Sequence, residues 1–376
     1  MPLDLSHFAS QRKCNPRRRG PSKGSIARKP ARRVLFLLFA AVGGVGGGFM
    51  KNILKRFLTA VVVLIFACQA AFLSSCSLEK SEAADPLKSE ETGMDEVALD
   101  DAFPMEYVNA YGISVTIEQR PETIVSVSPA MTEIVFALGQ EDRLIGRSDF
   151  DDYPPEALEI PSVGAIDMPN VETIVALEPD MVLASSIFSE EAFNTLTELG
   201  ITVVIVRDET SVEGMFDVIS EVGQVIGSVS EADSLVSELE AELIAIQEET
   251  SLLFDGVEED EKPTVYYCMG FGDYGEYTAG GDTFINDIIE MAGLKNAAGD
   301  ITGWAYSLEA LIEADPDYIL VPDWGYDSFI STAPYSELTA CVEGNVLMVD
   351  YNEFERQGPR NVDAIRTIFD FVSEDF

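Results

Sequence analysis

Two matching segments of the chain indicate its architecture. One reads Glu172-Thr-Ile-Val-Ala-Leu-Glu-Pro-Asp-Met-Val-Leu183 and the other Glu309-Ala-Leu-Ile-Glu-Ala-Asp-Pro-Asp-Tyr-Ile-Leu320. In both, a Glu opens a short helical pattern, a Pro-Asp pair ends it, and an apolar run typical of a buried strand follows. A Glu in a first helical turn interacts favourably with the helix dipole, which explains either one alone. Two glutamates at matched positions of the two segments, however, predict a pair of exposed carboxylates related by an internal repeat.

The segments around each repeat alternate between strand and helix patterns. Strand-like runs occur at 123–127, 144–146, 181–184 and 202–206 in the first half, and at 264–268, 318–321 and 346–349 in the second. Helical patterns lie between or after them, at 171–177, 190–199, 283–292, 308–314 and 362–372. This alternation predicts an α/β fold with two Rossmann-like, three-layer lobes, residues 106–228 and 256–376. The first lobe is expected to begin with a small hairpin at 108–117.

A long helix is expected between the two halves. Residues 229–255 contain apolar side chains at spacings of three and four, and Ser230 has the character of an N-cap, with Asp233 three positions later. A helix of about 24 residues is about 36 Å long. Such a helix could run along both lobes and join them once.

The first 105 residues have the features of a targeting segment and a tether. Met50, three basic residues and an apolar run at 57–73 resemble a secretory signal, and Leu73-Ser-Ser-Cys76 resembles the lipobox of bacterial lipoproteins. Residues 50–75 are thus predicted to be a signal peptide, Cys76 the acylated residue, and 76–105 an acidic tether. The alternative is a transmembrane anchor with a chance cysteine. Residues 1–49 are interpreted as a gene-model extension before Met50, or as a long n-region.

Charge and residue types exclude several functions. Residues 1–75 carry 13 basic residues and one acid, a net +12, whereas residues 76–376 carry 11 basic and 65 acidic residues, a net −54. So negative a chain repels nucleic acid. The single histidine, His7, precedes the mature chain, so a site of clustered histidines is not expected, and no hydrolase or P-loop motif points to an enzyme. Cys268 and Cys341 could pair, but two small buried residues is the favoured interpretation.

These features together resemble the substrate-binding proteins of ABC importers, specifically the family that captures ferric siderophores, haem and cobalamin. The resemblance covers about residues 106–376 and is carried by residues 121–133, 149–155, 170–180, 283–287 and 354–360. It implies an extracytoplasmic, lipid-anchored monomer that serves a permease dimer with a cytoplasmic ATPase. It also implies that Glu172 and Glu309 dock on arginines of that permease.

The ligand is expected beyond the carboxyl ends of the parallel strands. Flat aromatic side chains would contact a large, partly apolar chelate there, and arginines would bind its anionic oxygens. Packing within the loops is the alternative explanation for each aromatic residue. The candidate ligand-binding residues are Ser128, Met131, Tyr153, Ser186, Arg207, Tyr274, Trp304, Tyr306, Trp324 and Arg356.

Several ligands stay open at this point. An iron complex is favoured because the family mostly carries such ligands, with cobalamin as the alternative. The Phe354-Glu-Arg-Gln-Gly-Pro-Arg360 stretch is similar to that of cobalamin binders, although Phe150 stands where these often have tyrosine. The negative lobes disfavour ferric catecholates unless Arg207 and Arg356 offset the repulsion. Two other hypotheses remain. The protein could bind an oligosaccharide or an oxyanion, or it could be a surface adhesion or scaffold lipoprotein without a ligand. No intrinsic cofactor or protein-bound metal is expected.

Overall fold

The computed structural model describes residues 102–376. The predictions for residues 1–49, the signal peptide 50–75, Cys76 and nearly all of the tether 76–105 therefore lie outside the described residues. A small antiparallel hairpin of β1 (Met105–Val108) and β2 (Ser114–Ile117) precedes the first lobe, as the sequence predicted. No helix of the described part is long and apolar enough to cross a membrane.

The N-terminal lobe contains a four-stranded parallel sheet in the order β4-β3-β5-β6. Its strands are β3 (Ile124–Ser126), β4 (Leu144–Gly146), β5 (Met181–Ser185) and β6 (Thr202–Val206). Alternate residues of β5 and β6 point into two different cores. Helices α2 (Pro129–Ala137) and α5 (Val212–Ile226) cover one face, and α3 (Val171–Leu177) and α4 (Glu190–Glu198) cover the other. The lobe thus has the three predicted layers.

The C-terminal lobe repeats this arrangement, with a parallel sheet in the order β10-β9-β7-β8. Its strands are β7 (Thr264–Tyr267), β8 (Lys295–Asn296), β9 (Tyr318–Pro322) and β10 (Val346–Val349). On one face lie α7 (Phe284–Met291) and α12 (Arg360–Ser373), and on the other α8 (Leu308–Ala314), α9 (Tyr326–Ser331) and α10 (Thr339–Glu343). The short helix α11 (Tyr351–Glu355) follows β10.

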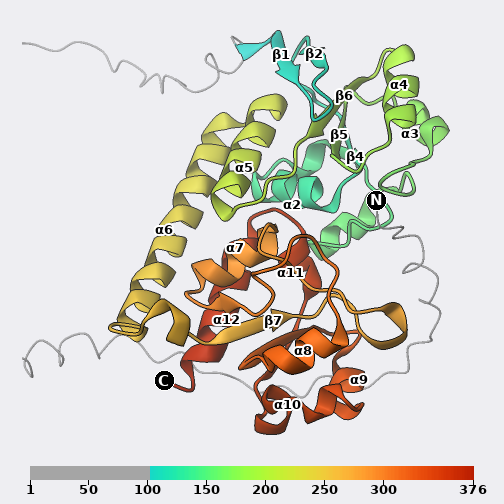
Figure 1. Ribbon diagram of the computed structural model, residues 1–376. Coiled ribbons are helices and arrows are strands. Elements are labelled where there is room, and N and C mark those ends of the chain that lie inside the picture. The colour runs from blue at the N-terminus through green and yellow to red at the C-terminus, as the bar shows by residue number, and fades with distance from the viewer. Residues whose placement is uncertain (1–101) are drawn as a thin grey trace, which may run out of the picture. The chain divides into compact units, whose positions relative to one another are not determined.

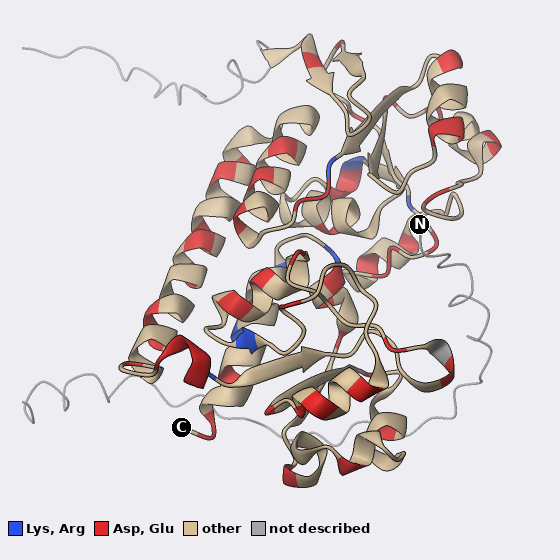
Figure 2. Cartoon of the chain, in the orientation of Figure 1, with Lys and Arg blue, Asp and Glu red and all other residues tan. Residues whose placement is uncertain are grey.

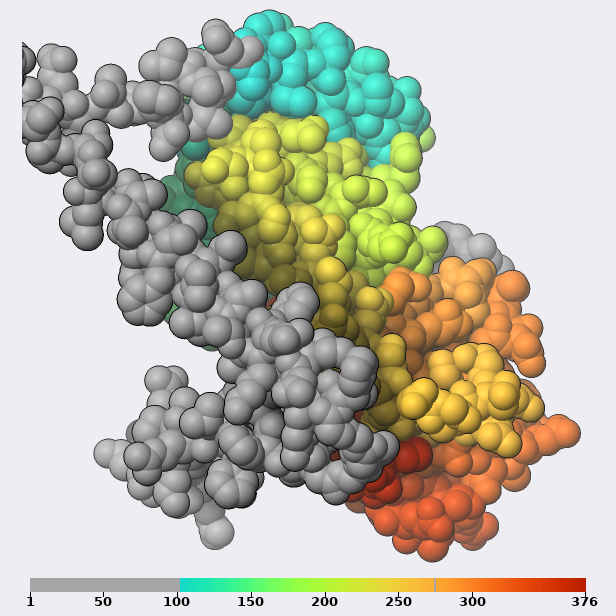
Figure 3. All heavy atoms as spheres, turned by 90° about the vertical axis from the view of Figure 1, so that its left-hand side faces the viewer, coloured from blue at the N-terminus to red at the C-terminus, as the bar shows by residue number. Residues whose placement is uncertain are grey.

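Helix α6 (Val229–Leu253) is the predicted connection between the halves. It packs on α5 in the first lobe and on α12 in the second, and Figure 3 shows its yellow to gold residues between the two lobes. The predicted N-cap at Ser230 is wrong, because the helix begins at Val229 after Ser228. The left-handed Gly227 (φ 70°) ends α5 only two residues earlier, so α6 starts directly after the turn. Gly223 permits this close approach, since a Cβ there would lie 2.4 Å from the Cβ of Ala232.

The internal repeat is also a repeat of contacts. Asn170 caps α3 by accepting a hydrogen bond from Thr173 N, and Ser307 caps α8 by accepting one from Ala310 N. Each Pro-Asp pair then anchors the first strand of its own lobe. Asp180 accepts hydrogen bonds from the backbone and hydroxyl of Thr123, and Asp317 accepts the same pair from Thr264. Both helices are therefore fixed to their sheets in the same way.

Candidate functional site

The carboxyl ends of the two sheets face each other across the lobes. Arg356, which follows β10 and α11, donates a hydrogen bond of 3.0 Å to the carbonyl oxygen of Phe150, which follows β4. Ligands of open parallel sheets bind beyond these strand ends, and small-molecule sites commonly lie between domains. The surface between the facing strand ends, called the inter-lobe face below, is therefore the candidate ligand site.

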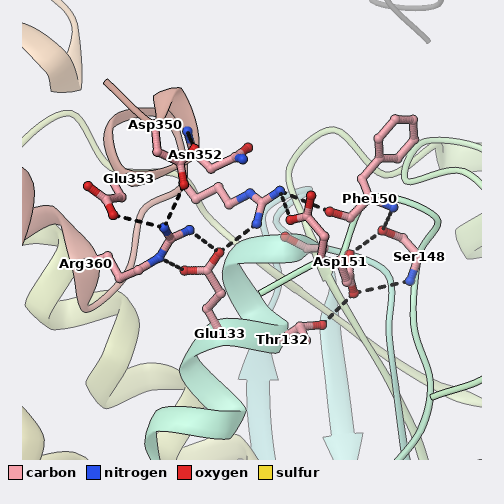
Figure 4. Close-up of polar contacts among 12 residues, drawn as sticks. Thr132, Glu133, Ser148, Phe150, Asp151, Asp350, Asn352, Glu353 and Arg360 are labelled. Carbon is pink, nitrogen blue, oxygen red and sulfur yellow. Dashed lines mark hydrogen bonds and ion pairs between the residues drawn. The ribbon is translucent and has the colours of Figure 1, made fainter. Parts of the chain in front are cut away.

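A buried carboxylate on α2 holds two arginines of the other lobe. Glu133, only 5% exposed, accepts a 2.8 Å hydrogen bond from Nη1 of Arg356 on Oε1. Arg360 donates through Nε and Nη2 to the two oxygens of the same carboxylate, each at 2.8 Å. Figure 4 shows the side chains of Glu133 and Arg360 directed at each other. A charge-assisted, bidentate contact of this kind is the strongest sort of side-chain hydrogen bonding.

Further acidic groups surround these two arginines. Asp152 pairs with Nη2 of Arg356 at 2.8 Å, and Asp350 and Glu353 lie 3.4 and 3.5 Å from Nη1 of Arg360. The ring of Tyr153 lies against Arg360, with 3.9 Å between the guanidinium carbon and the ring centroid. We call Glu133, Asp152, Asp350, Glu353, Arg356 and Arg360 together the Glu133 cluster.

The cluster keeps both arginines firmly protonated. Burial alone would lower the pKa of Arg356 and of Arg360, but the contacts with Glu133 outweigh burial and raise both pKa values. Asp152 adds to this effect for Arg356, and Asp350 adds to it for Arg360. Because both guanidinium groups are already paired with carboxylates of the protein, they have few hydrogen-bond donors left for an anionic ligand.

Asp151 lies next to the cluster and is fully buried. Its carboxylate accepts hydrogen bonds from Thr132 Oγ1 (2.6 Å) and from the backbone and hydroxyl of Ser148. Burial raises the pKa of Asp151 to about 6, although those hydrogen bonds oppose the rise. They fix the loop after β4, which also carries Phe150 and Asp152.

Other contacts join the lobes beside the cluster. The side-chain amide of Gln357 accepts a 2.8 Å hydrogen bond from Glu209 N and donates one to Glu209 O. Val212 N, at the start of α5, donates to Asp287 of α7 at 2.6 Å. These contacts place the segment after β6 against residues of the C-terminal lobe.

Two carboxylates near the strand ends, one in each lobe, have raised pKa values. Asp208, after β6, and Glu355, at the end of α11, are both exposed to solvent. Desolvation nevertheless raises the pKa of Asp208 and raises that of Glu355 to about 7. Ser186 donates a hydrogen bond to Asp208, and Tyr267 donates one to Glu355.

Aromatic side chains lie at the strand ends of the C-terminal lobe. Trp324, after β9, is 47% exposed and stacks on Phe271 with ring planes 13° apart. Trp304 is half-buried and packs on the central core, and Tyr306 is half-buried with its ring 5.7 Å from that of Tyr266. Of these aromatic residues, Trp324 therefore presents the largest exposed fraction of its surface.

The other candidate residues differ in their exposure. Ser128 and Met131 are buried, Tyr153 is 42% exposed, and Arg207 is exposed at the end of the edge strand β6. The backbone of Tyr274 belongs to the 3₁₀ turn Gly272–Tyr274. The candidate ligand-binding residues did not include Glu133, Asp152, Gln357 or Arg360, although all four lie in segments that carry the family resemblance, 121–133, 149–155 and 354–360. A carboxylate within the apolar 131–135 run was the available signal for Glu133.

Glu172 and Glu309 are both exposed, in the first turn of α3 and of α8. Among the described residues, no group of three or more histidine, cysteine or acidic side chains is arranged to hold a metal ion. Cys268 and Cys341 are free thiols, the first buried and the second half-buried.

Two α/β lobes joined by one long helix, with facing strand ends, define a bilobal ligand-binding protein. A family model described as "Periplasmic binding protein" matches residues 124–352, and the chain belongs to that family. It is a substrate-binding protein of an ABC importer, which confirms the resemblance found in the sequence. The family consists of solute-binding proteins and not of enzymes.

Curated relatives support the same assignment. The chain is 33% identical over 280 residues to the uncharacterized ABC transporter substrate-binding lipoprotein YvrC of Bacillus subtilis (strain 168), with 73% of this chain and 87% of the relative covered. It is 32% identical over 280 residues to a cobalamin-binding protein of Halobacterium salinarum, covering 70% of this chain and 73% of the relative.

Solved structures of similar fold include a possible iron-binding periplasmic solute-binding protein from Staphylococcus epidermidis. It is 26% identical with a TM-score of 0.58, and 68% of this chain and 99% of that one are covered. The periplasmic haem-binding protein RhuT from Roseiflexus is also 26% identical, with a TM-score of 0.60 and coverage of 67% and 98%.

Proposed function

We propose that this protein captures a corrinoid of the cobalamin type outside the cell and delivers it to an ABC permease. The observation that carries the proposal is the 32% identity over 280 residues to a relative named as a cobalamin-binding protein. The Phe354–Arg360 stretch, which is similar to that of cobalamin binders, supplies Arg356, Gln357 and Arg360 to the contacts between the lobes. The exposed side chain of Trp324, two residues after the end of β9, offers a flat apolar surface.

An iron complex is the second candidate, and it was favoured in the sequence analysis. The 26% identity to a structure described as a possible iron-binding protein supports it. The two candidates share a large metal chelate as ligand and differ in its chemistry.

Calorimetric titration with cyanocobalamin tests the proposal, with ferrioxamine B and haemin as alternative ligands. We expect saturable binding of one cyanocobalamin per chain, and about 2.7 kcal/mol of added stability at a ligand concentration 100 times Kd. Mass spectrometry of natively purified protein is the complementary test, because it identifies a retained ligand. Binding of ferrioxamine B without any binding of cyanocobalamin would move the assignment to the second candidate.

We further propose that Glu172 and Glu309 dock the loaded protein on the permease. Both are exposed, and both occupy the same position in the repeated helix–strand unit, so a permease dimer with one basic patch per subunit could bind them together. Charge pairs at an interface govern orientation and association rate more than affinity. The double variant Glu172→Lys/Glu309→Lys should therefore abolish uptake while ligand affinity stays within about twofold, well below the tenfold that 1.4 kcal/mol represents.

The matched control for docking is Glu198→Lys/Glu343→Lys. It makes the same charge change at one exposed acid in each lobe, on α4 and α10 and not on α3 and α8. Normal uptake by the control, with loss in the docking variant, supports the assignment. If the docking variant and the control variant lose uptake equally, the effect is due to net charge alone.

The membrane anchor is proposed to be the lipidated Cys76. We expect Cys76→Ala to leave an unprocessed precursor or to release soluble protein, measured by fractionation of cells. Unchanged membrane retention of this variant would contradict lipidation at Cys76.

A further inference from the structure

The described residues include few basic side chains, and nearly all of these form hydrogen bonds or ion pairs within the protein. They hold nine Lys and Arg side chains. Eight donate to, or pair with, acceptors of the chain itself: Arg120, Arg143, Arg147, Lys262, Lys295, Arg356, Arg360 and Arg366. Arg207 is the one basic side chain of this part of the protein for which no hydrogen bond or ion pair is found. Figure 2 shows how sparse the basic segments are beside the acidic ones.

The two arginines at the inter-lobe face interact with more carboxylates than they can neutralise. In the Glu133 cluster, Arg356 and Arg360 face four carboxylates, those of Glu133, Asp152, Asp350 and Glu353. Even with one of these four protonated, the cluster carries a net negative charge. A ligand anion would have to compete with contacts of 2.8 Å that are already formed inside the protein.

The inter-lobe face has two further acidic groups, Asp208 and Glu355, and Glu355, with a pKa of about 7, is partly ionised at neutral pH. Asp208 follows β6 of the N-terminal lobe, and Glu355 ends α11 of the C-terminal lobe. Arg207 is adjacent to Asp208 and directly follows β6, the edge strand of its sheet. Among the described residues, Arg207 is therefore the one cation without an acceptor in the protein, and the adjacent carboxylate of Asp208 offsets its charge.

We infer that the inter-lobe face accepts metal chelates that are neutral or cationic and excludes those with net negative charge. This inference rests on the proposed capture of a metal chelate and specifies its charge. Neutral corrinoids and ferric trihydroxamates, whose three hydroxamates balance the charge of Fe³⁺, satisfy the rule. Ferric tris-catecholates, which are trianionic, and haem, which carries two propionates, do not.

Two series of ligands that differ only in charge test the inference. One is ferrioxamine B with its free amine (cationic), with the amine acetylated (neutral) and with it succinylated (anionic). The other is cyanocobalamin (neutral) and its monocarboxylic-acid derivatives (anionic). At low ionic strength we expect about tenfold weaker binding for each added negative charge, because like charges about 10 Å apart repel with roughly this magnitude at an intermediate dielectric. The differences should shrink in about 1 M salt, where screening is nearly complete.

The double variant Asp208→Asn/Glu355→Gln should reduce the ratio between the affinities for the neutral and anionic members of a series. Glu198→Gln, an exposed acid on α4, is the control and should leave that ratio unchanged. Equal affinity across a series, or tightest binding of the anionic member, overturns the inference. Selective binding of the cationic and neutral ferrioxamines, with no binding of cyanocobalamin, refutes the corrinoid but supports the charge rule. Failure of every chelate to bind counts against both proposals.

Discussion

Replacing Glu133 by Gln should destabilise the protein strongly, because Glu133 is the buried anion shared by two arginines of the other lobe. The substitution preserves the shape of the side chain and removes its charge. Three hydrogen bonds of 2.8 Å then lose their ionised acceptor, while Arg356 and Arg360 stay nine-tenths buried. Removing one partner of a buried ion pair costs about 3–5 kcal/mol. Asp152 still pairs with Arg356, and Asp350 and Glu353 still lie near Arg360. We therefore expect the free energy of unfolding to fall by about 3 kcal/mol, the lower end of that range.

Urea unfolding followed by tryptophan fluorescence and circular dichroism measures this loss. Glu249→Gln is the matched control, since it removes the carboxylate that binds Arg366 in two hydrogen bonds on the exposed surface between α6 and α12. Surface pairs of this type contribute little, so the control should unfold close to the parent. The double variant Glu133→Gln/Arg360→Gln should lose less than the sum of its single changes. A Glu133→Gln loss no larger than that of the control would refute the reasoning.

Three further predictions concern titration, motion and thiols. The pKa of Asp151 in the folded protein, about 6, lies above its value in the unfolded chain. The free energy of unfolding should therefore fall by up to about 3 kcal/mol as the pH rises from about 4 to about 6. Urea unfolding measures this trend, and Asp151→Asn should flatten it. Solution scattering should show nearly equal radii of gyration with and without ligand, since α6 and the Glu133 cluster restrict closure to a few degrees; a large change would contradict this. Thiol titration of the native protein should modify Cys341 before Cys268, because Cys341 is half-buried and Cys268 fully buried; burial raises the pKa of both thiols.

The repeated units were predictable to the residue because their signals are local. The predicted helices 171–177 and 308–314 coincide with α3 and α8, whose caps and Pro-Asp ends all lie within the quoted segments. Short elements such as β8 and α9 were missed, since two to six residues carry too little periodicity. The start of α6 was misplaced because the turn at Gly227, not the serine at 230, determines it.

The site was less predictable, since its main contacts join residues far apart in the chain. Glu133 and Arg360 are separated by 227 positions, and neither has a neighbouring residue that indicates the pair. Arg356 was predicted to bind anionic oxygens of the ligand. The structure gives it two such oxygens from the protein itself, on Glu133 and Asp152. A sequence shows that an arginine lies near a strand end, but only the packing of the lobes shows whether its charge is available.

The same contacts relate the two proposals to each other. Asp180 and Asp317 fix the helices of Glu172 and Glu309 to their own sheets, and the Glu133 cluster fixes one sheet relative to the other. The distance between Glu172 and Glu309, the proposed docking carboxylates, therefore depends on the buried charge pairs between the lobes as well as on α6. Arginines that perform this structural task are neutralised by it. Arginines that join the lobes in this way are not available to bind an anion, so the expected small closure and the proposed preference for uncharged or cationic chelates both follow from the Glu133 cluster.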